Sequence, residues 1–579
     1  MMRRNSAWGQ ARFMRAHACA VALAALAALA LAFAGVHSAY AAGVDCEIAD
    51  CAKSAFTWDS STNTLTMKEA SIDCPSVGYY YDLVHFSPDG TSDANPTATV
   101  VLAGTVQVSA NGVVESVIGT DDVDLVITGP QSLVVTGRCT GHAIRAFRGG
   151  ITVRGGHLSL EGDGNSIEAY NDFVIDSADA DVSVRNVGDE CGITVGGNFT
   201  MNNGTLYVDG SSSGVYCTGR ESALTIAGGA ATLGTSFIGL QSAGDVNLTG
   251  GQVIISAMEQ SGIELNKDVT LDGAEVVIDG PATQYGIYSD KGGLAAKSGT
   301  LIISNCDMGI RLADGTLFNQ ANTATINGAS VNLNKMQWTA IEVTNLNLKS
   351  GTLKIDGCNM GLEAYDSFVM TGGNLNVKAT AMGLYANKKF HIVGGSATIE
   401  CRNARNFAFS TGSNSDVKVD PSCLTVKTGC LEAGVTFKAG GSTYVVNDSS
   451  GAVTLKSYGG TSKTPTVNVV KYGGFTYKVE AIGASAFATA KGKAIKKLML
   501  GKNVEIVGAK AFAGTTNLVT LDATNFRYSG AELAKTAFKN CGKSKGAKLT
   551  VLCKSRDKDP MQKLLVSKGL SKKATFKAK

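Results

Sequence analysis

The sequence predicts an all-β solenoid: a parallel β-helix of about 11–14 rungs, followed by a second, shorter solenoid. Three observations lead to this prediction. One phrase recurs about every 23 residues, apolar and polar residues alternate within each copy, and the 579 residues include 69 Gly but only 8 Pro. Because alternation is typical of strands and paired glycines are typical of tight turns, short strands joined by turns account for all three.

The composition is that of a folded protein. Hydrophobic residues make up 44% of the chain, charged residues 17%, and the net charge is +3. Collagen would need Gly at every third position, and a disordered chain would need less apolar content or a larger charge imbalance. Both classes are therefore excluded.

Residues 1–42 are expected to be a secretory signal peptide. Four arginines precede an apolar run over residues 18–33, and small residues at 38–42 offer a cleavage site. A membrane anchor is the alternative, although the apolar run is short for one. We therefore expect a secreted protein, extracellular or non-covalently associated with the cell wall, with no membrane insertion after cleavage.

Thirteen cysteines follow this segment, an odd number for a set of disulfides. The only closely spaced pairs are Cys46/Cys51, Cys423/Cys430 and Cys541/Cys553, and no C-x-x-C motif occurs. This pattern does not favour a zinc site. Most of the cysteines are expected to be small buried apolar side chains.

The recurring phrase, for example GIELNKDVTLDG or GLYANKKFHIVGG, carries one aliphatic anchor in each copy. Successive anchors are 23, 26, 22, 25, 23, 24, 23, 31, 21 and 22 residues apart. Two or three short strands in such a period fit a parallel β-helix, whereas a propeller blade needs about 40 residues. We therefore predict a β-helix over residues 43–412. Its anchors are Ile144, Ile167, Ile193, Val215, Leu240, Ile263, Ile287, Ile310, Ile341, Leu362 and Leu384.

If the anchors point inward, the residues one and three positions later point outward, because side chains alternate along a strand. Aromatic rings among charged and amide groups suit a sugar polymer, which packs its C–H faces on rings. An ordinary solvated sheet face with strand-favouring Tyr is the alternative. The predicted outward strip contains Arg145, Phe147, Glu168, Tyr170, Thr194, Tyr216, Gln241, Glu264, Tyr288, Arg311, Glu342, Glu363, Tyr365 and Tyr385.

The 31-residue step between Ile310 and Ile341 interrupts the period, and Trp338 lies just before the second of these anchors. Long excursions from a solenoid tend to lie on its binding face. Trp338 is therefore predicted either to overhang the strip as part of the ligand site or to cover a local apolar seam.

A group of acidic residues, Asp121, Asp122 and Asp124, falls in a predicted turn. Closely spaced carboxylates supply the oxygen ligands that Ca²⁺ prefers, so we consider a calcium site here. The segment matches neither an EF-hand loop nor a calcium-binding G-G-x-G-x-D repeat. Solvated turn acids are the alternative.

After residue 412 the character of the chain changes. Residues 413–470 are predicted to be a β-rich connector, and residues 471–579 a domain in which Ala-Phe pairs recur at Phe487, Phe512 and Phe538. The phrases YKVEAIGASAFA and VEIVGAKAFAG resemble the BspA-type leucine-rich repeat of bacterial surface proteins, over about 465–560. This resemblance implies a concave sheet that binds a host surface protein or a wall partner, and it supplies no catalytic residues.

The long array, with its opening FTWDSSTNTLTMKEASI and its G-I/L-x-A phrases, resembles a family of secreted bacterial β-helix proteins described as carbohydrate-binding, over about 46–412. The resemblance implies calcium-assisted binding of an acidic polysaccharide. No individual ligand residue is carried over.

These features lead us to expect a non-catalytic glycan-binding adhesion protein. One alternative is a polysaccharide lyase or glycoside hydrolase, for which Glu342 and Glu363 on neighbouring rungs would be the paired carboxylates. The other is a structural stalk that presents the C-terminal domain.

The net charge of +3 conceals a strong asymmetry. Residues 471–579 contain 23 Lys and Arg against 6 Asp and Glu, whereas residues 43–470 contain 25 against 43. We expect no nucleic-acid partner, and the basic end could hold the protein to an anionic cell-wall polymer. A solubilising surface is the alternative for these lysines.

Overall fold

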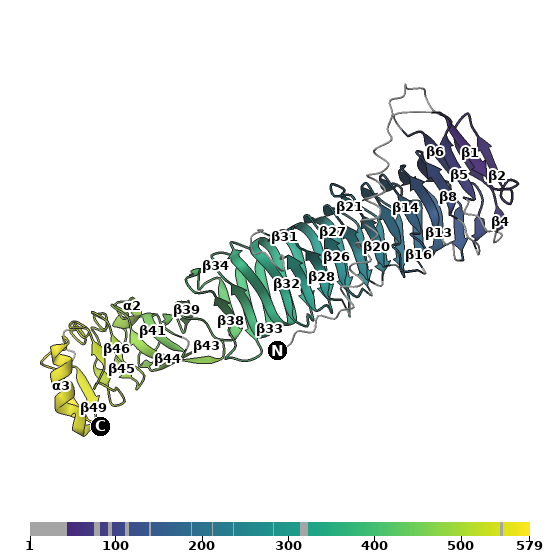
Figure 1. The fold of residues 1–579 in the computed structure, drawn as a ribbon. Helices are drawn as coiled ribbons and strands as arrows, with labels where there is room; N and C mark the ends of the chain where they lie inside the picture. Colours follow the sequence, from purple (N-terminus) through teal and green to yellow (C-terminus); the bar gives the residue numbers. More distant parts are fainter. Residues whose placement is uncertain are drawn as a thin grey trace. The chain divides into compact units, whose positions relative to one another are not determined.

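The computed structural model describes residues 43–579 except 75–81, 91–94, 111–114, 138–140, 187, 211, 236, 257, 282, 313–321, 449 and 545–547. The described residues form an all-β parallel β-solenoid of about 18 turns with about 3% helix, which confirms the predicted fold class (Figure 1). The chain divides into two compact units, Met1–Gly293 and Leu294–Lys579. The predicted signal peptide, residues 1–42, lies outside the described residues.

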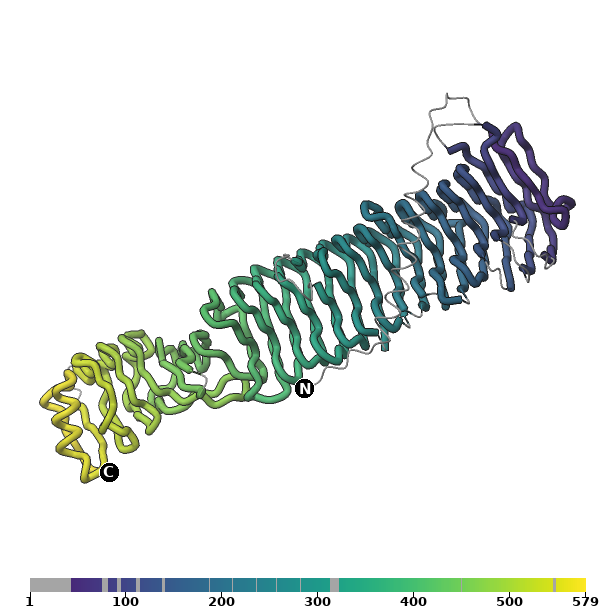
Figure 2. The backbone as a smooth tube through the Cα atoms, viewed as in Figure 1, coloured from purple at the N-terminus to yellow at the C-terminus, as the bar shows by residue number. Residues whose placement is uncertain are grey.

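In the first unit the strands form three parallel stacks, each adding one strand per turn, and Figure 2 shows the successive turns of the backbone side by side. The first stack consists of β5 (Val84–Pro88), β8 (Ser116–Asp121), β11 (His142–Phe147), β14 (Ile167–Ala169), β17 (Ile193–Val195), β20 (Ser213–Cys217), β23 (Ile238–Ser242), β26 (Ser261–Leu265) and β28 (Tyr285–Ser289).

The other two stacks of this unit complete each turn. The second consists of β3 (Thr64–Met67), β6 (Thr97–Leu102), β9 (Asp124–Thr128), β12 (Ile151–Val153), β15 (Phe173–Ile175), β18 (Phe199–Met201), β21 (Leu224–Ile226), β24 (Val246–Leu248) and the start of β27 (Val269–Asp279). The third consists of β4 (Ala70–Asp73), β7 (Val106–Ser109), β10 (Ser132–Thr136), β13 (Gly156–Gly162), β16 (Ala180–Asn186), β19 (Thr205–Asp209), β22 (Ala230–Gly234), β25 (Gln252–Ser256) and the end of β27.

The interior of the first unit is a set of aliphatic and aromatic ladders. The anchor Ile144 pairs in register with Ile167, and both are fully buried. In the second stack the rings of Phe173 and Phe199 are stacked with their centroids 5.6 Å apart. Identical side chains therefore meet at identical positions of neighbouring turns, which is the packing that the repeat predicts.

A glycine precedes eight of the eleven anchors, and close packing requires it at Gly262. At Gly262 an added Cβ would lie 2.5 Å from Ile278 Cγ2 and 2.7 Å from the carbonyl oxygen of Gly286. Neither approach is tolerated by a real side chain, so the Gly-aliphatic pair of the phrase follows from the space available at this corner.

Two antiparallel pairings occur at the N-terminal end of the described chain. β1 (Val44–Ile48) pairs with β5, and β2 (Phe56–Asp59) pairs with β3. Trp58 packs against Phe86 with ring centroids 5.5 Å apart. The N-terminal end of the described chain thus combines antiparallel pairs with the first parallel turns.

Along one corner of the first unit, Asp and Asn side chains tie several turns to the turn that follows. Asp172 Oδ1 accepts a hydrogen bond from the backbone N–H of Asn198 (2.7 Å), and Asn198 Oδ1 accepts from the N–H of Ala223 (2.9 Å). Further along, Asp245 Oδ1 accepts from the N–H of Asp268 (3.0 Å). We call these residues the turn ladder.

The second unit is built in the same way. Its strands include β29 (Leu294–Ser304), β30 (Met308–Leu312), β31 (Thr323–Asn334), β32 (Thr339–Met370), β33 (Asn374–Ala386), β34 (Lys389–Ile392), β35 (Ser396–Cys401) and β36 (Phe409–Thr411). β37 (Asp416–Val419) pairs with β34, and β38 (Leu424–Thr428) pairs with β35. Parallel pairing therefore extends beyond residue 412 into the segment predicted as a connector.

The C-terminal part of the second unit has two sheets. One contains β39 (Thr436–Ala439), β40 (Ser442–Val446), β41 (Ala452–Ser457), β43 (Val469–Tyr472), β44 (Phe475–Ile482), β46 (Ile506–Val507) and β48 (Glu532–Leu533). The other, the basic sheet, contains β42 (Thr466–Val467), β45 (Lys497–Leu500), β47 (Thr520–Asp522), β49 (Thr550–Cys553) and β50 (Thr575–Ala578). The helical segments are α2 (Ala490–Lys493), η2 (Ser555–Asp557) and α3 (Lys558–Ser567).

The recurring phenylalanines of this part form one stacked column. Ring centroids of Phe487 and Phe512 lie 5.4 Å apart, and those of Phe512 and Phe538 lie 4.9 Å apart. All three rings are fully buried. The second repeat seen in the sequence is thus a second ladder.

All twelve cysteines among the described residues are free thiols, including the three closely spaced pairs. Eight of the twelve are buried, as expected for small apolar side chains. Burial raises the pKa of the Cys217 thiol to about 12, which makes this thiol unreactive. In the described part of the chain, no helix has the length and apolar character needed to cross a membrane.

Candidate functional site

The register of the first stack aligns the predicted strip residues in one column, in which Thr194 is buried and the others are partly exposed. Arg145 pairs with Glu168, Glu168 with Thr194, and Thr194 with Tyr216. The column then continues through Gln241, Glu264 and Tyr288. In the second unit Arg311 pairs with Glu342, and Glu363 pairs with Tyr385.

Arg145 is the centre of a charged group that we call the Arg145 cluster. Its Nη1 donates to Glu115 Oε1 (2.6 Å), and its Nε donates to Glu168 Oε2 (3.1 Å). The same oxygen of Glu168, Oε2, lies 3.2 Å from His142 Nε2, and His142 Nδ1 contacts the carbonyl oxygen of Asn165 (2.8 Å). Arg145 is 30% exposed and Glu168 16%, so these groups are fixed yet reachable from solvent.

Two aromatic rings adjoin this cluster. Phe147 and Tyr170 have ring centroids 5.8 Å apart, and the guanidinium groups of Arg145 and Arg148 lie 5.3 and 4.8 Å from the Phe147 centroid. Such distances are typical of cation–π contacts. Rings and charges thus occupy neighbouring turns of the same stack.

The remaining strip residues of the first unit make local contacts. Tyr216 is half-buried in the column between Thr194 and Gln241. Tyr288 stacks on Tyr285 with centroids 4.8 Å apart, and its hydroxyl donates to Asp290. The structure therefore does not bring these two tyrosines into the Arg145 cluster.

A second charged group, the Glu342 cluster, lies in the second unit. Tyr365 donates its hydroxyl proton to Glu342 Oε1 (2.7 Å), and Arg311 Nε lies 3.4 Å from the same oxygen. The side chain of Glu342 is only 8% exposed. An ionised carboxylate at this burial is stabilised by such partners.

The neighbouring Glu363 lies in an environment that disfavours a negative charge on its carboxyl group. Burial, and secondly the negative charge of Glu342, raise the pKa of the Glu363 carboxyl. Burial and the hydrogen bond to Glu342 likewise raise the pKa of Tyr365, which keeps its proton on the hydroxyl. The Glu363 carboxyl therefore holds its proton to higher pH than a solvated carboxyl does.

The last two predicted residues of the strip are more open. Trp338 is 55% exposed, directly before β32, and its carbonyl oxygen accepts from the N–H groups of Asn359 and Met360. A side chain this exposed favours the overhanging position over the role of covering an apolar seam. Tyr385 places its hydroxyl 3.4 Å from Asn387 Oδ1, within its own strand end.

The three candidate calcium ligands do not converge. Asp124 Oδ1 accepts from the N–H of Gly150 (2.7 Å), Asp122 pairs with Arg148 (3.3 Å), and Asp121 lies 3.8 Å from His85 Nε2. Over the residues that the structure describes, no group of three or more His, Cys, Asp or Glu side chains is arranged to hold a metal ion. Each of the three carboxylates instead contacts a different partner in its own or a neighbouring turn.

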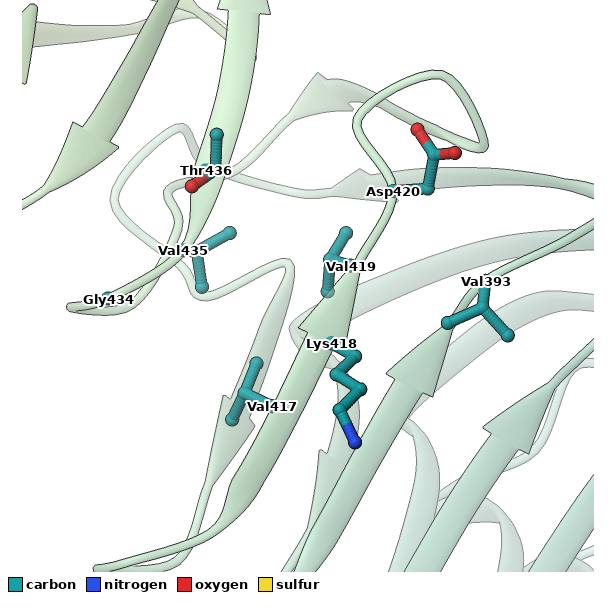
Figure 3. Close-up of a pocket in the computed structure, with 8 residues that line it drawn as sticks. All are labelled: Val393, Val417, Lys418, Val419, Asp420, Gly434, Val435 and Thr436. Atoms are coloured by element: carbon teal, nitrogen blue, oxygen red, sulfur yellow. The ribbon is translucent and has the colours of Figure 1, made fainter. Parts of the chain in front are cut away.

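A hollow of about 360 Å³ lies beside β37 (Figure 3). Its wall includes Val393, Val417 and Val435, together with Lys418 and Asp420. Both charged groups are engaged elsewhere, since Lys418 pairs with Asp416 (3.1 Å) and Asp420 accepts from Ser422 (2.8 Å). None of the residues of the strip lines this hollow.

Sequence reasoning missed Glu115, His142 and Arg148. Glu115 lies before the first clear copy of the phrase, and it reaches Arg145 from the preceding turn. His142 and Arg148 flank the anchor segment at positions that the alternation rule does not assign outward. A wider reading of each copy, from two residues before the anchor to four after it, would have included His142 and Arg148.

No protein-family model matches this chain, and neither a curated protein sequence nor a solved structure matches it.

Proposed function

We propose that this protein is a non-catalytic, secreted or surface-associated glycan-binding adhesion protein whose ligand lies on the outward strip. The observation that carries the proposal is the Arg145 cluster with its adjoining rings of Phe147 and Tyr170. The predicted secretion and the resemblance to carbohydrate-binding β-helix proteins add support from the sequence.

The chemistry of the cluster suits a sugar. The Phe147 and Tyr170 rings offer apolar faces to C–H groups, while Glu168, Arg145 and His142 offer acceptors and donors to hydroxyls. Because Arg145 is held at two nitrogens, little side-chain entropy is lost when a ligand binds.

The repeat also favours a polymer over a single sugar. Neighbouring turns present equivalent outward positions about 4.8 Å apart, so an extended chain along a stack meets a new set of groups at every turn. Tyr216, Gln241 and Glu264 continue the column of the Arg145 cluster. Trp338, Tyr365 and Tyr385 give the second unit rings for an equivalent contact.

Hydrolysis is the second candidate, and the difference in environment between Glu342 and Glu363 is the observation that favours it. A retaining glycosidase needs one ionised carboxylate and one proton donor about 5–5.5 Å apart. The same Oε1 atom of Glu342, however, accepts from Tyr365 and faces Arg311, at 8% exposure. These contacts favour a structural role for Glu342, so we retain the binding function.

The test is a glycan array probed with the full chain, with and without Ca²⁺. Removing both rings in a Phe147→Ala/Tyr170→Ala variant is expected to weaken binding about tenfold, which is about 1.4 kcal/mol. The matched control is Tyr207→Ala, because Tyr207 is 45% exposed on β19 of a different stack. Binding to no glycan would favour the stalk, and equal losses in both variants would contradict the strip.

Catalysis is checked on the same ligands by release of reducing ends or unsaturated uronates. Turnover abolished by Glu363→Gln would establish the enzyme and overturn a purely binding function.

A further inference from the structure

The outer face of the basic sheet carries two in-register columns. Lys497 pairs with Thr520, Thr520 with Thr550, and Thr550 with Thr575. The residues between the columns, such as Leu498, Leu521 and Val551, are fully buried and form the inner face. The second outer column consists of Thr466, Met499, Asp522, Leu552 and Lys577.

Asp522 fixes lysines on this face. Its Oδ2 accepts from Lys579 Nζ (2.9 Å) and lies 3.9 Å from Lys497 Nζ. The Asp522 side chain is 4% exposed, whereas those of Lys497 and Lys579 are 38% and 53% exposed. A buried carboxylate thus holds ammonium groups that remain open to solvent.

The charges on the face do not balance. On these two columns Lys497, Lys577 and the adjoining Lys579 outnumber the single side-chain carboxylate, that of Asp522. The surrounding residues add to this excess, since residues 471–579 hold 23 Lys and Arg against 6 Asp and Glu. The excess of positive charge therefore favours an anionic ligand over an uncharged one on this face.

The threonine column supplies hydroxyl groups beside these charges. Thr520, Thr550 and Thr575 repeat at the spacing of neighbouring strands, about 4.8 Å. Lysines at the edges and hydroxyls between them match a chain whose anionic oxygens recur along its length. The cations are all lysines, which act as point charges and suit single phosphate or carboxylate oxygens.

We propose that the outer face of the basic sheet, defined by Lys497, Lys577, Lys579 and the threonine column, binds a linear anionic polymer of the cell wall type. The shared chemistry is a row of phosphate or carboxylate groups. A nucleic acid is less suited, because the outer columns contain no aromatic ring on which bases could stack. This site uses none of the residues of the glycan-binding strip.

The test measures binding of the full chain to labelled inorganic polyphosphate, to polygalacturonate and to single-stranded DNA at several salt concentrations. The face variant is Lys497→Gln/Lys577→Gln/Lys579→Gln. The matched control, Lys491→Gln/Lys510→Gln/Lys563→Gln, removes the same charge from exposed lysines on α2, in the turn after β46 and on α3. All six lysines are at least partly exposed, so both variants are expected to fold.

We expect the face variant to lose at least about tenfold in affinity and the control less than about threefold, with a shallower salt dependence for the face variant. Preference for polyphosphate or for polygalacturonate identifies the source of the anionic groups. Equal losses of affinity in the two variants would show that binding depends on the overall charge of the domain and not on this face, and would overturn the site. Failure to bind either polymer in 0.1 M salt, or tighter binding of DNA, would also overturn it. Since the strip is unchanged in both variants, glycan binding provides a separate readout.

Discussion

The Glu342 cluster allows the packing of the strip to be tested by a double-mutant cycle of Tyr365→Phe and Glu342→Gln. The first change removes the hydroxyl that donates to Glu342 Oε1 over 2.7 Å. A hydrogen bond to a charged group contributes about 1.5–3 kcal/mol, and Tyr365 is half-buried, so we expect a loss of about 1.5 kcal/mol.

The second change leaves the Arg311 guanidinium facing a neutral amide. Breaking a fully buried ion pair costs about 3–5 kcal/mol, but Arg311 is 23% exposed, so solvent screening reduces the expected loss to about 2 kcal/mol. Glu342→Gln also turns the charge-assisted hydrogen bond from Tyr365 into a neutral one, so both changes weaken the contact between residues 365 and 342. The double variant is therefore expected to lose less than the sum, with a coupling of about 1 kcal/mol.

Because the Glu342 cluster affects one part of the solenoid, the assay is local hydrogen exchange in peptides from Thr339–Met370. Exchange should become about tenfold faster in Tyr365→Phe. The control is Tyr385→Phe, whose hydroxyl makes only a 3.4 Å contact with Asn387, and it should change exchange little. Equal effects of Tyr365→Phe and Tyr385→Phe, or strict additivity in the cycle, would refute the reasoning.

Three further predictions concern protonation and packing. Since burial and the charge of Glu342 raise the pKa of Glu363, its contribution to stability is present below the unfolded pKa and is lost as pH rises through the folded pKa. Glu363→Gln should therefore flatten the pH dependence of exchange in β32, and an unchanged slope would contradict this. Burial alone raises the pKa of Asp522, but hydrogen bonds from Thr524 and Lys579 outweigh it and the net shift is downward. Its contribution is therefore present above the unfolded pKa and lost as pH falls through the folded pKa, so Asp522→Asn should cost about 2 kcal/mol in thermal melts at pH 7 and much less in acid. Gly262→Ala should cost about 1–3 kcal/mol by overpacking against Ile278, whereas Gly90→Ala, with no atom within 4 Å of its added Cβ, should be nearly neutral in the same melts.

The period of the sequence was sufficient to predict the ladders. Anchors spaced by about 23 residues, such as Ile144 and Ile167, are paired in the structure, and the outward column follows from strand alternation. The column of Phe487, Phe512 and Phe538 follows from the same logic. In each case a local rule acts on residues that recur in phase.

Partners across turns could not be predicted in this way. Glu115 reaches Arg145 from a segment with no recognisable phrase, and the carboxylates of Asp121, Asp122 and Asp124 point to three different partners although they are adjacent in sequence. Such contacts depend on the direction of each side chain and on which turn is its neighbour. The sequence of a single turn specifies neither of these. The antiparallel pairing of β1 with β5 likewise joins segments far apart in the sequence, and no repeated motif predicts it.

The turn ladder has a consequence for how such a chain can change in length. Each acceptor, such as Asp172 or Asn198, satisfies the backbone of the following turn rather than its own. A unit with Asp or Asn at its corner supplies an acceptor for the backbone N–H of the following turn, and its own backbone N–H donates to the side chain of the preceding turn. Duplication or loss of a complete unit with Asp or Asn at its corner therefore preserves these bonds, whereas an insertion of a few residues at the corner breaks them. Selection could thus adjust the number of turns in whole units without redesigning any of them.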